Sequence, residues 1–137
     1  MRRAEVTAQV LMDRQAGTLP GRFGLKVTRL EDRRLDAEVL IEPWMLAPNG
    51  FLHAASVLLL ADTAAGYACM AHLPATAKNF TTLELKSNFL GTTRQGTIRA
   101  ECRAEHLGRT TQVWAASVFG PGDRTLALFR CTQLVLS

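Results

Sequence analysis

The sequence has few cysteines, and they do not form a recognisable pattern. Cys69, Cys102 and Cys131 are the only three, and they lie far apart in the chain. Disulfide frameworks and zinc sites need cysteines in pairs or at short, regular spacings. We therefore expect free, buried thiols in a reducing cytoplasm, and no metal site.

The sequence also lacks a strong charge imbalance. Its formal net charge is +4, and no run of Lys and Arg alternates with aromatic residues. Proteins that bind nucleic acid usually carry such a basic patch, so we expect no nucleic-acid partner. The mild excess fits a solvated surface, or a polyanionic small molecule such as a phosphorylated cofactor.

Long apolar runs and targeting segments are missing as well. No basic segment followed by an apolar stretch and a cleavage site opens the sequence, so we expect no signal peptide. The longest apolar run is interrupted by Asp62, and we expect it to be too short to cross a membrane. With 137 residues, of which 47% are hydrophobic, we expect one domain. In it, residues 1–19 form an N-terminal helix and loop, and residues 20–137 form the core.

One stretch has almost no charge. Between Pro43 and Ala77, Asp62 is the only acidic residue, and there is no Lys or Arg. Residues 54–70 are apolar on nearly every side, which predicts a buried helix that ends before Pro74. Burial without a nearby cation raises the pKa of a carboxylate and is costly unless the group has partners or a function. Asp62 is therefore the first catalytic candidate; the alternative is that it caps a helix starting at Thr63.

The rest of the sequence predicts a second helix and six strands. Residues 3–15 read as a short helix with Val6, Val10 and Leu11 inward, followed by a loop at residues 17–21. Alternation of apolar and polar residues predicts strands at 25–30, 34–41, 82–90, 97–107, 111–119 and 125–136, the third with Leu83, Leu85 and Phe89 on one face. Short links imply antiparallel neighbours. The predicted fold is an antiparallel sheet around one apolar helix, which one sheet covers only in part, so we expect an oligomer.

The start of the central helix is a candidate binding site. His53 lies nine residues before Asp62, and Asn49 and Gly50 precede it in a predicted loop. Free backbone N–H groups at a helix start stabilise a developing oxyanion, and Ala54, Ala55 and Ser56 would supply them. For His53 a purely structural role at the helix start remains the alternative.

The surroundings of Asp62 suit chemistry on a bound substrate. Ala65 and Gly66 lie one turn away and are small, so they leave space beside the carboxylate. A carboxylate with a raised pKa and room beside it can act as a general base or as a nucleophile.

Three motifs resemble those of a known family. N-G-x-x-H at 49–53, L-A-D-T-A at 60–64 and Y-A-C at 67–69 resemble the PaaI-type acyl-CoA thioesterases of the hotdog-fold superfamily. The resemblance covers roughly residues 20–136 and includes G-R-T at 108–110 and A-L-F-R at 127–130. It implies a hotdog fold of the α+β class and hydrolysis of an acyl-CoA in the cytoplasm. It also implies a homodimer or a tetramer of dimers, and no cofactor besides the coenzyme A of the substrate.

The resemblance also implies roles for individual residues. Asp62 would be catalytic, Asn49 and His53 would position the thioester, and Thr82, or Thr81, would assist the water. Beside these, two groups of residues are weaker candidates, because solvated arginines and core apolar residues are common. Arg94, Arg109 and Arg124 lie in predicted turns and would suit coenzyme A phosphates, and Trp44, Met45, Leu46 and Phe51 would suit an acyl pocket.

Two departures from the family pattern leave other functions open. The usual H-G-G is His53-Ala54-Ala55 here, and the loop asparagine lies closer to the histidine than usual. If the oxyanion site needs a backbone that only glycine adopts, alanine is a handicap. A non-catalytic acyl-CoA-binding or regulatory protein is therefore one alternative, and a hydratase of the same fold is another.

Overall fold

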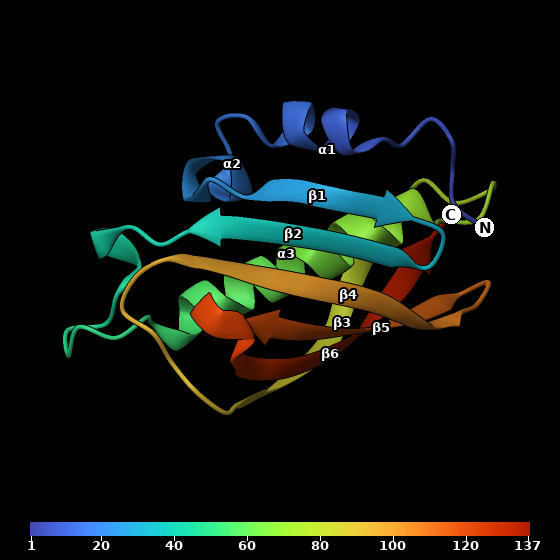
Figure 1. Cartoon of the computed structure of the whole chain (residues 1–137). Helices are drawn as coiled ribbons and strands as arrows, with labels where there is room; N and C mark the ends of the chain where they lie inside the picture. The colour runs from blue at the N-terminus through green and yellow to red at the C-terminus, as the bar shows by residue number, and fades with distance from the viewer.

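The fold is a curved antiparallel sheet wrapped around one long helix (Figure 1). The computed structural model describes all 137 residues. The sheet has six strands in the order β1-β2-β4-β5-β6-β3. Its strands are β1 (Lys26–Glu31), β2 (Arg34–Leu40), β3 (Asn79–Phe89), β4 (Thr97–Leu107), β5 (Thr111–Phe119) and β6 (Thr125–Leu136), and helix α3 (Ala54–Ala71) lies across it. The predicted α+β fold class is confirmed.

Period-two alternation places the core between the sheet and α3. On β2 the residues Leu35, Ala37 and Val39 are buried, and they alternate with half-exposed or exposed residues. The same alternation holds along β5 and along β4 as far as Cys102, and α3 packs on all three strands. Two short 3-10 helices, η1 (Pro43–Met45) and η2 (Pro121–Asp123), lie in the connecting loops.

The sequence of α3 predicts a helix that is buried on nearly every side, but the structure buries only part of its surface. Its buried face is made largely of alanine, which lets the helix lie close to the sheet. The opposite stripe is only half-buried, and it consists of Leu58, Leu59, Asp62, Thr63, Gly66, Tyr67 and Met70. By length and composition α3 could cross a membrane, contrary to the prediction that the run is too short, but over half of it is buried in this fold as a core helix is.

Strand β3 is an edge strand, and a bulge interrupts it. It pairs with β6 on one side only, and its register shifts between Thr82 and Glu84. Leu83 lies at the bulge and has no register partner, whereas Leu85 and Phe89 lie opposite the buried residues Cys131 and Ala127. All three side chains are more than 40% exposed, since nothing in the chain covers this edge.

The N-terminal region differs from its prediction. Thr7 caps the first helix by accepting from the N–H of Val10 at 3.2 Å, so α1 is Ala8–Gln15 and not residues 3–15. Val6 and Leu11 are buried as predicted, whereas Val10 is exposed. The predicted loop at 17–21 contains a second helix, α2 (Leu19–Phe23), because Pro20 suits a first helical turn and Gly24 closes the helix at φ 82°.

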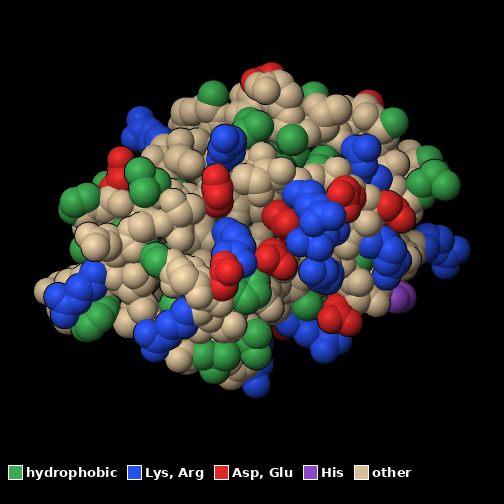
Figure 2. All heavy atoms as spheres, viewed as in Figure 1, with side chains coloured by type: hydrophobic (Ala, Val, Ile, Leu, Met, Phe, Trp, Pro, Cys, Tyr) green, Lys and Arg blue, Asp and Glu red, His purple; other side chains and the backbone are tan.

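The outer face of the sheet is charged. Figure 2 shows Lys and Arg intermixed with Asp and Glu across the middle of this face. Arg34 pairs with Asp36 at 2.9 Å and with Glu101 at 3.5 Å, and Arg103 reaches Glu101 at 3.6 Å. This face therefore carries ion pairs, and the apolar core lies on the other side, against α3.

Candidate active site

Asp62 lines a cavity of about 420 Å³ that lies between α1, α3 and β3. The half-buried stripe of α3 forms one wall, and the first residues of β3 form another. The lining residues are Leu11, Arg14, Gln15, Thr18, Pro20, Asp62, Thr63, Gly66, Tyr67, Met70, Asn79, Phe80 and Thr82. The cavity thus joins one carboxylate to hydroxyl groups and aromatic rings.

The Asp62 carboxylate is largely without support. Its Oδ1 is buried and has no hydrogen-bond partner, and Arg14 is the one Lys or Arg among the residues that line the same cavity. Burial raises the pKa of Asp62 above its ordinary value of 3.8. Since α3 begins at Ala54, the alternative that Asp62 caps a helix starting at Thr63 is wrong. A buried polar group with no structural partner is the expected state of a group kept for chemistry.

The start of α3 offers one free donor and not three. The N–H of Ala55 donates to Nδ1 of His53 at 2.9 Å, and the N–H of Ser56 donates to the His53 carbonyl at 2.9 Å. The prediction of free N–H groups at Ala55 and Ser56 is therefore wrong. The Ala54 N–H has no acceptor in the structure, so it alone is available to an oxyanion.

The loop before α3 is held in a fixed shape. Oδ1 of Asn49 accepts from the N–H of Phe51 at 3.1 Å, and Gly50 adopts φ 87°, which favours glycine. The Arg94 guanidinium lies 4.3 Å from the centroid of the Phe51 ring. Asn49 thus shapes the loop with its carboxamide oxygen, and Arg94 is the arginine closest to this loop among the three candidates.

Gly66 and Thr82 line the Asp62 cavity, whereas the adjacent candidates Ala65 and Thr81 do not. A Cβ at Gly66 would stand 3.2 Å from Cζ of Phe80, so the ring packs directly on the helix backbone. Ala65, the other predicted small neighbour, is fully buried in the core and does not line the cavity. Of the two predicted hydroxyl residues, Thr82 lines the cavity and Thr81 does not.

The remaining candidates lie elsewhere in the chain. Arg109 follows Gly108, which lies with His72 in a hollow at the C-terminal end of α3, so one chain does not bring Arg109 to the helix start. Trp44, Met45 and Leu46 line a separate hollow of about 240 Å³ that also contains His53. Phe51 does not line it.

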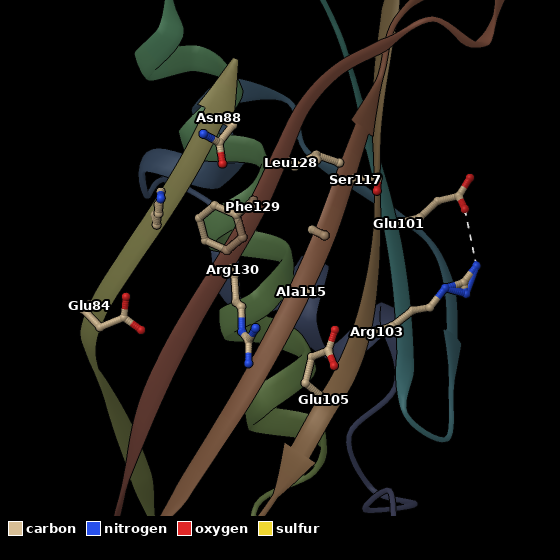
Figure 3. A pocket seen from close by; sticks show the side chains of 12 residues that line it. Glu84, Asn88, Glu101, Arg103, Glu105, Ala115, Ser117, Leu128, Phe129 and Arg130 are labelled. Carbon is tan, nitrogen blue, oxygen red and sulfur yellow. Dashed lines mark ion pairs between the residues drawn. The ribbon is translucent and has the colours of Figure 1, made fainter. Parts of the chain in front are cut away.

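The largest hollow, about 610 Å³, lies on the outer face of the sheet, away from Asp62. Figure 3 shows its side chains projecting from β3, β4, β5 and β6, including the Glu101–Arg103 ion pair. Since α3 lies on the other face, this hollow contributes nothing to the Asp62 site. No group of three or more His, Cys, Asp or Glu side chains is arranged to hold a metal ion anywhere in the structure.

Sequence analysis missed several residues of the site. Tyr67 donates to Oε1 of Gln15 at 2.6 Å, which ties α3 to α1 at the cavity wall. Thr82 donates to Oε1 of Gln133 at 2.8 Å. A signal for Gln133 existed, because it is a polar residue at an inward position of a strand whose other inward residues are apolar.

Comparison with known proteins gives the family. A model of the thioesterase superfamily matches residues 49–127. A 1,4-dihydroxy-2-naphthoyl-CoA hydrolase of Escherichia coli is 26% identical over 96% of both chains. The proofreading thioesterase EntH of Klebsiella pneumoniae is 29% identical, again over 96% of both chains.

Solved structures agree with this result. A thioesterase of Pseudomonas aeruginosa, solved as a mutant, superposes with a TM-score of 0.93 at 27% identity, covering 98% of this chain and 97% of that one. The PaaI protein of E. coli has the same fold, with a TM-score of 0.78 at 22% identity over 86% of this chain and 83% of that one. The resemblance seen in the sequence motifs is therefore confirmed. The chain is a hotdog-fold enzyme that belongs to the thioesterase superfamily.

Proposed function

We propose that this protein hydrolyses an acyl-CoA thioester to the free acid and coenzyme A, with Asp62 as the catalytic carboxylate. Its superfamily supports thioester hydrolysis, and the E. coli 1,4-dihydroxy-2-naphthoyl-CoA hydrolase supports an acyl-CoA substrate. The observation that carries the proposal is the unpartnered Asp62 carboxylate on the cavity wall. The Ala54 N–H would stabilise the oxyanion.

The departure from H-G-G does not weaken this proposal. Ala54 and Ala55 are the first two residues of α3, and neither has a positive φ. Alanine therefore adopts this backbone without strain, and the Ala54 N–H remains free. This favours an enzyme over the alternative of a non-catalytic acyl-CoA-binding protein.

We also propose that the active site is shared between two copies of the chain. A helix rises about 1.5 Å per residue, so Ala54 and Asp62 lie roughly 12 Å apart along α3. Oxyanion donors must approach within about 3 Å of the same group that the carboxylate acts on. One helix cannot meet both needs, whereas an antiparallel α3 from a second copy can.

The surface of the chain supports this pairing. The open edge of β3 has unpaired backbone groups and exposed apolar side chains, which favour pairing with another strand. The half-buried stripe of α3, with Asp62 in its middle, faces the cavity that β3 also lines. A two-fold dimer through this edge would cover both surfaces and build two equivalent sites.

Asp62→Asn tests the catalytic assignment. Release of free thiol from a panel of acyl-CoA substrates should be clear for the wild type, and kcat should fall by about a hundredfold or more in the variant, with little change in affinity. Asp13→Asn is the control and should keep wild-type turnover, because Asp13 is an exposed residue of α1 that does not line the cavity. A wild type that binds acyl-CoA without releasing thiol would indicate a regulator instead.

The pH profile gives a second measurement. The carboxylate acts in its ionised form, so kcat/KM should rise with pH as Asp62 loses its proton. Burial raises the Asp62 pKa, so this acid limb should lie above the ordinary aspartate value of 3.8. The limb should disappear in Asp62→Asn. A limb that persists unchanged in that variant belongs to another group.

Isotope labelling tests one nucleophilic route for Asp62, in which water opens an anhydride at the aspartyl carbonyl; label found only in the product acid excludes that route but not attack at the acyl carbon. In a single turnover in ¹⁸O water, a general base leads to label in the product acid. An anhydride opened by water at the aspartyl carbonyl leaves the label in Asp62 instead. Mass spectrometry of the product and of the Asp62 peptide distinguishes the outcomes.

A further inference from the structure

Two buried glutamines face each other across β5 and β6. Gln112 and Gln133 are register partners, and both side chains are fully buried. Burying a carboxamide is costly unless hydrogen bonds replace its lost contacts with water. The contacts of the two residues therefore indicate why each is kept.

Gln112 has a complete structural explanation. Its Nε2 donates to the carbonyl of His72 at 2.9 Å, and its Oε1 accepts from Nε1 of Trp114 at 2.8 Å. Both bonds lie within the core, and Gln112 does not line the Asp62 cavity. Gln112 thus holds the C-terminal end of α3 to the sheet.

Gln133 has a different set of partners. Its Nε2 faces only Sγ of Cys131 at 3.4 Å, which is a weak acceptor, and its one strong bond is from the Thr82 hydroxyl at 2.8 Å. Thr82 lines the same cavity as Asp62, so the one strong hydrogen bond of Gln133 goes to a residue of the Asp62 site. Gln133 therefore contacts a side chain of the cavity from the inner face of the neighbouring strand β6.

The local backbone places Thr82 for this contact. Thr82 is the register partner of Gln133, and the bulge in β3 begins directly after it. Bulges often re-aim side chains next to active sites. Here Thr82 keeps its hydroxyl on the inner side of an edge strand, between Gln133 and the cavity that Asp62 lines.

The single proton of the Thr82 hydroxyl decides what this group can bind. Since that proton is donated to Gln133, the Thr82 oxygen can only accept further hydrogen bonds. An ionised Asp62 carboxylate is also only an acceptor. A water molecule between them must donate one proton to each, so its lone pairs point away from both residues.

We propose that Gln133 is a positioning residue that orients the nucleophilic water through Thr82; this rests on the proposed function, in its general-base form. The water oxygen bonds to the thioester carbonyl carbon while the proton that it shares with Asp62 passes to the carboxylate. The carbon–sulfur bond then breaks, its electron pair leaves with the coenzyme A thiolate, and Asp62 returns the proton to that sulfur.

A double-mutant cycle in kcat tests this role. Thr82→Val and Gln133→Met each remove one side of the bond, and each should lower kcat by about tenfold or more, with KM changed by no more than about twofold. If Gln133 acts through Thr82, the double variant should lose no more than the more impaired single variant.

Gln112→Met is the matched control. It is equally buried and loses two core hydrogen bonds, so its unfolding free energy should fall at least as much as that of Gln133→Met. Its kcat should nevertheless stay within about twofold of wild type, because it touches neither Thr82 nor the cavity. Folding of each variant is verified by urea titration before kinetics.

The outcomes separate this inference from the proposed function. If the wild type is active but the kcat losses of Thr82→Val and Gln133→Met multiply in the double variant, the two residues act independently. That result overturns the positioning role of Gln133 and leaves the proposed function intact. Equal loss of kcat in Gln112→Met and Gln133→Met overturns the positioning role as well. A wild type that releases no thiol from any acyl-CoA overturns the proposed function and this inference together.

Discussion

At the scale of single residues, the Ala54 N–H can be removed without disturbing the helix. Proline lacks this N–H and is well tolerated at the first position of a helix. The preceding residue, His53, already has φ −67° and ψ 138°, the conformation that a following proline requires. Ala54→Pro should therefore fold normally and lower kcat by about a hundredfold or more, as loss of an oxyanion donor does.

The control for this variant keeps the N–H and changes only the side chain. Ala54→Gly should retain most of the wild-type kcat, and both variants should show wild-type circular dichroism. If Ala54→Pro folds and turns over as fast as Ala54→Gly, the oxyanion donor is another group.

Single residues also show which features of the candidate site can be predicted from the sequence. Asp62 was predictable because one charge in an apolar helix is visible in the sequence alone. The number of free N–H donors at the helix start was not predictable, because the His53 side chain accepts from the Ala55 N–H and the sequence does not specify its rotamer. Gln133 depends on a strand register that pairs residues 51 positions apart, and no local pattern encodes that pairing.

At the scale of elements, Arg3 holds the C-terminal end of α3. Its Nε donates to the Leu73 carbonyl at 2.9 Å, and its Nη2 donates to the carbonyls of Pro74 and Ala77. These carbonyls lie in the loop that follows α3, which ends at Ala71, and a cation beyond the C-terminal end of a helix also suits its dipole. Arg3→Ala should lower the unfolding free energy by about 1 to 3 kcal/mol.

Urea titration measures this loss, and Arg2→Ala is the control. Arg2 donates only to the Val6 carbonyl within its own segment, so its loss should be much smaller. Equal losses of unfolding free energy in the two variants would mean that the hydrogen bonds of Arg3 to these carbonyls add no stability beyond the effect of its positive charge.

The same end of α3 makes stability depend on pH. Nε2 of His72 accepts from the Arg33 N–H at 2.8 Å, so the ring is neutral, and Nδ1 is 2.7 Å from the Ala68 carbonyl. Burial lowers the pKa of His72, although the hydrogen bond to the Ala68 carbonyl and the charge of Asp32 oppose this. The unfolded chain therefore takes up a proton at a higher pH than the folded one. The stabilisation is complete above the ordinary histidine pKa of 6.5 and is lost as pH falls towards the lower folded value.

Urea unfolding at a series of pH values below 7 measures this dependence. The wild type should lose stability over this range, and His72→Asn, which cannot titrate there, should lose less. His106→Asn, which leaves the His72 contacts intact, should follow the wild type. Parallel curves for His72→Asn and the wild type would assign the dependence to other groups.

The helices and strands also show where local sequence patterns are not sufficient to predict the structure. The strands on either side of β4 were predictable, since each has one buried face and a clean alternation. The bulge in β3 was not, because an edge strand has little burial to fix its pattern. Helix α2 was missed because Pro20 and Gly21 are typical of loops, yet proline also opens helices and Gly21 lies directly against the Gln15 carbonyl.

At the scale of the whole molecule, a shared site predicts complementation. Asp62→Asn and Ala54→Pro chains are each inactive alone, but a mixed dimer has one site with both groups intact and one with neither. Random exchange puts about half of the chains in mixed dimers, so activity should return to roughly a quarter of wild type. Mass spectrometry verifies the exchange, and no recovery after verified exchange contradicts the shared site.

The strand order has a consequence for how the chain is made. β3 follows α3 directly in the sequence, but its only partner in the sheet is β6, whose residues 125–136 are synthesised after β4 and β5. During translation the apolar α3 and the unpaired β3 must wait for that last strand, a period in which such surfaces are prone to aggregate. Since Gln133 and the partner positions of β3 lie on β6, the β3 wall of the Asp62 cavity cannot form before β6 has been synthesised.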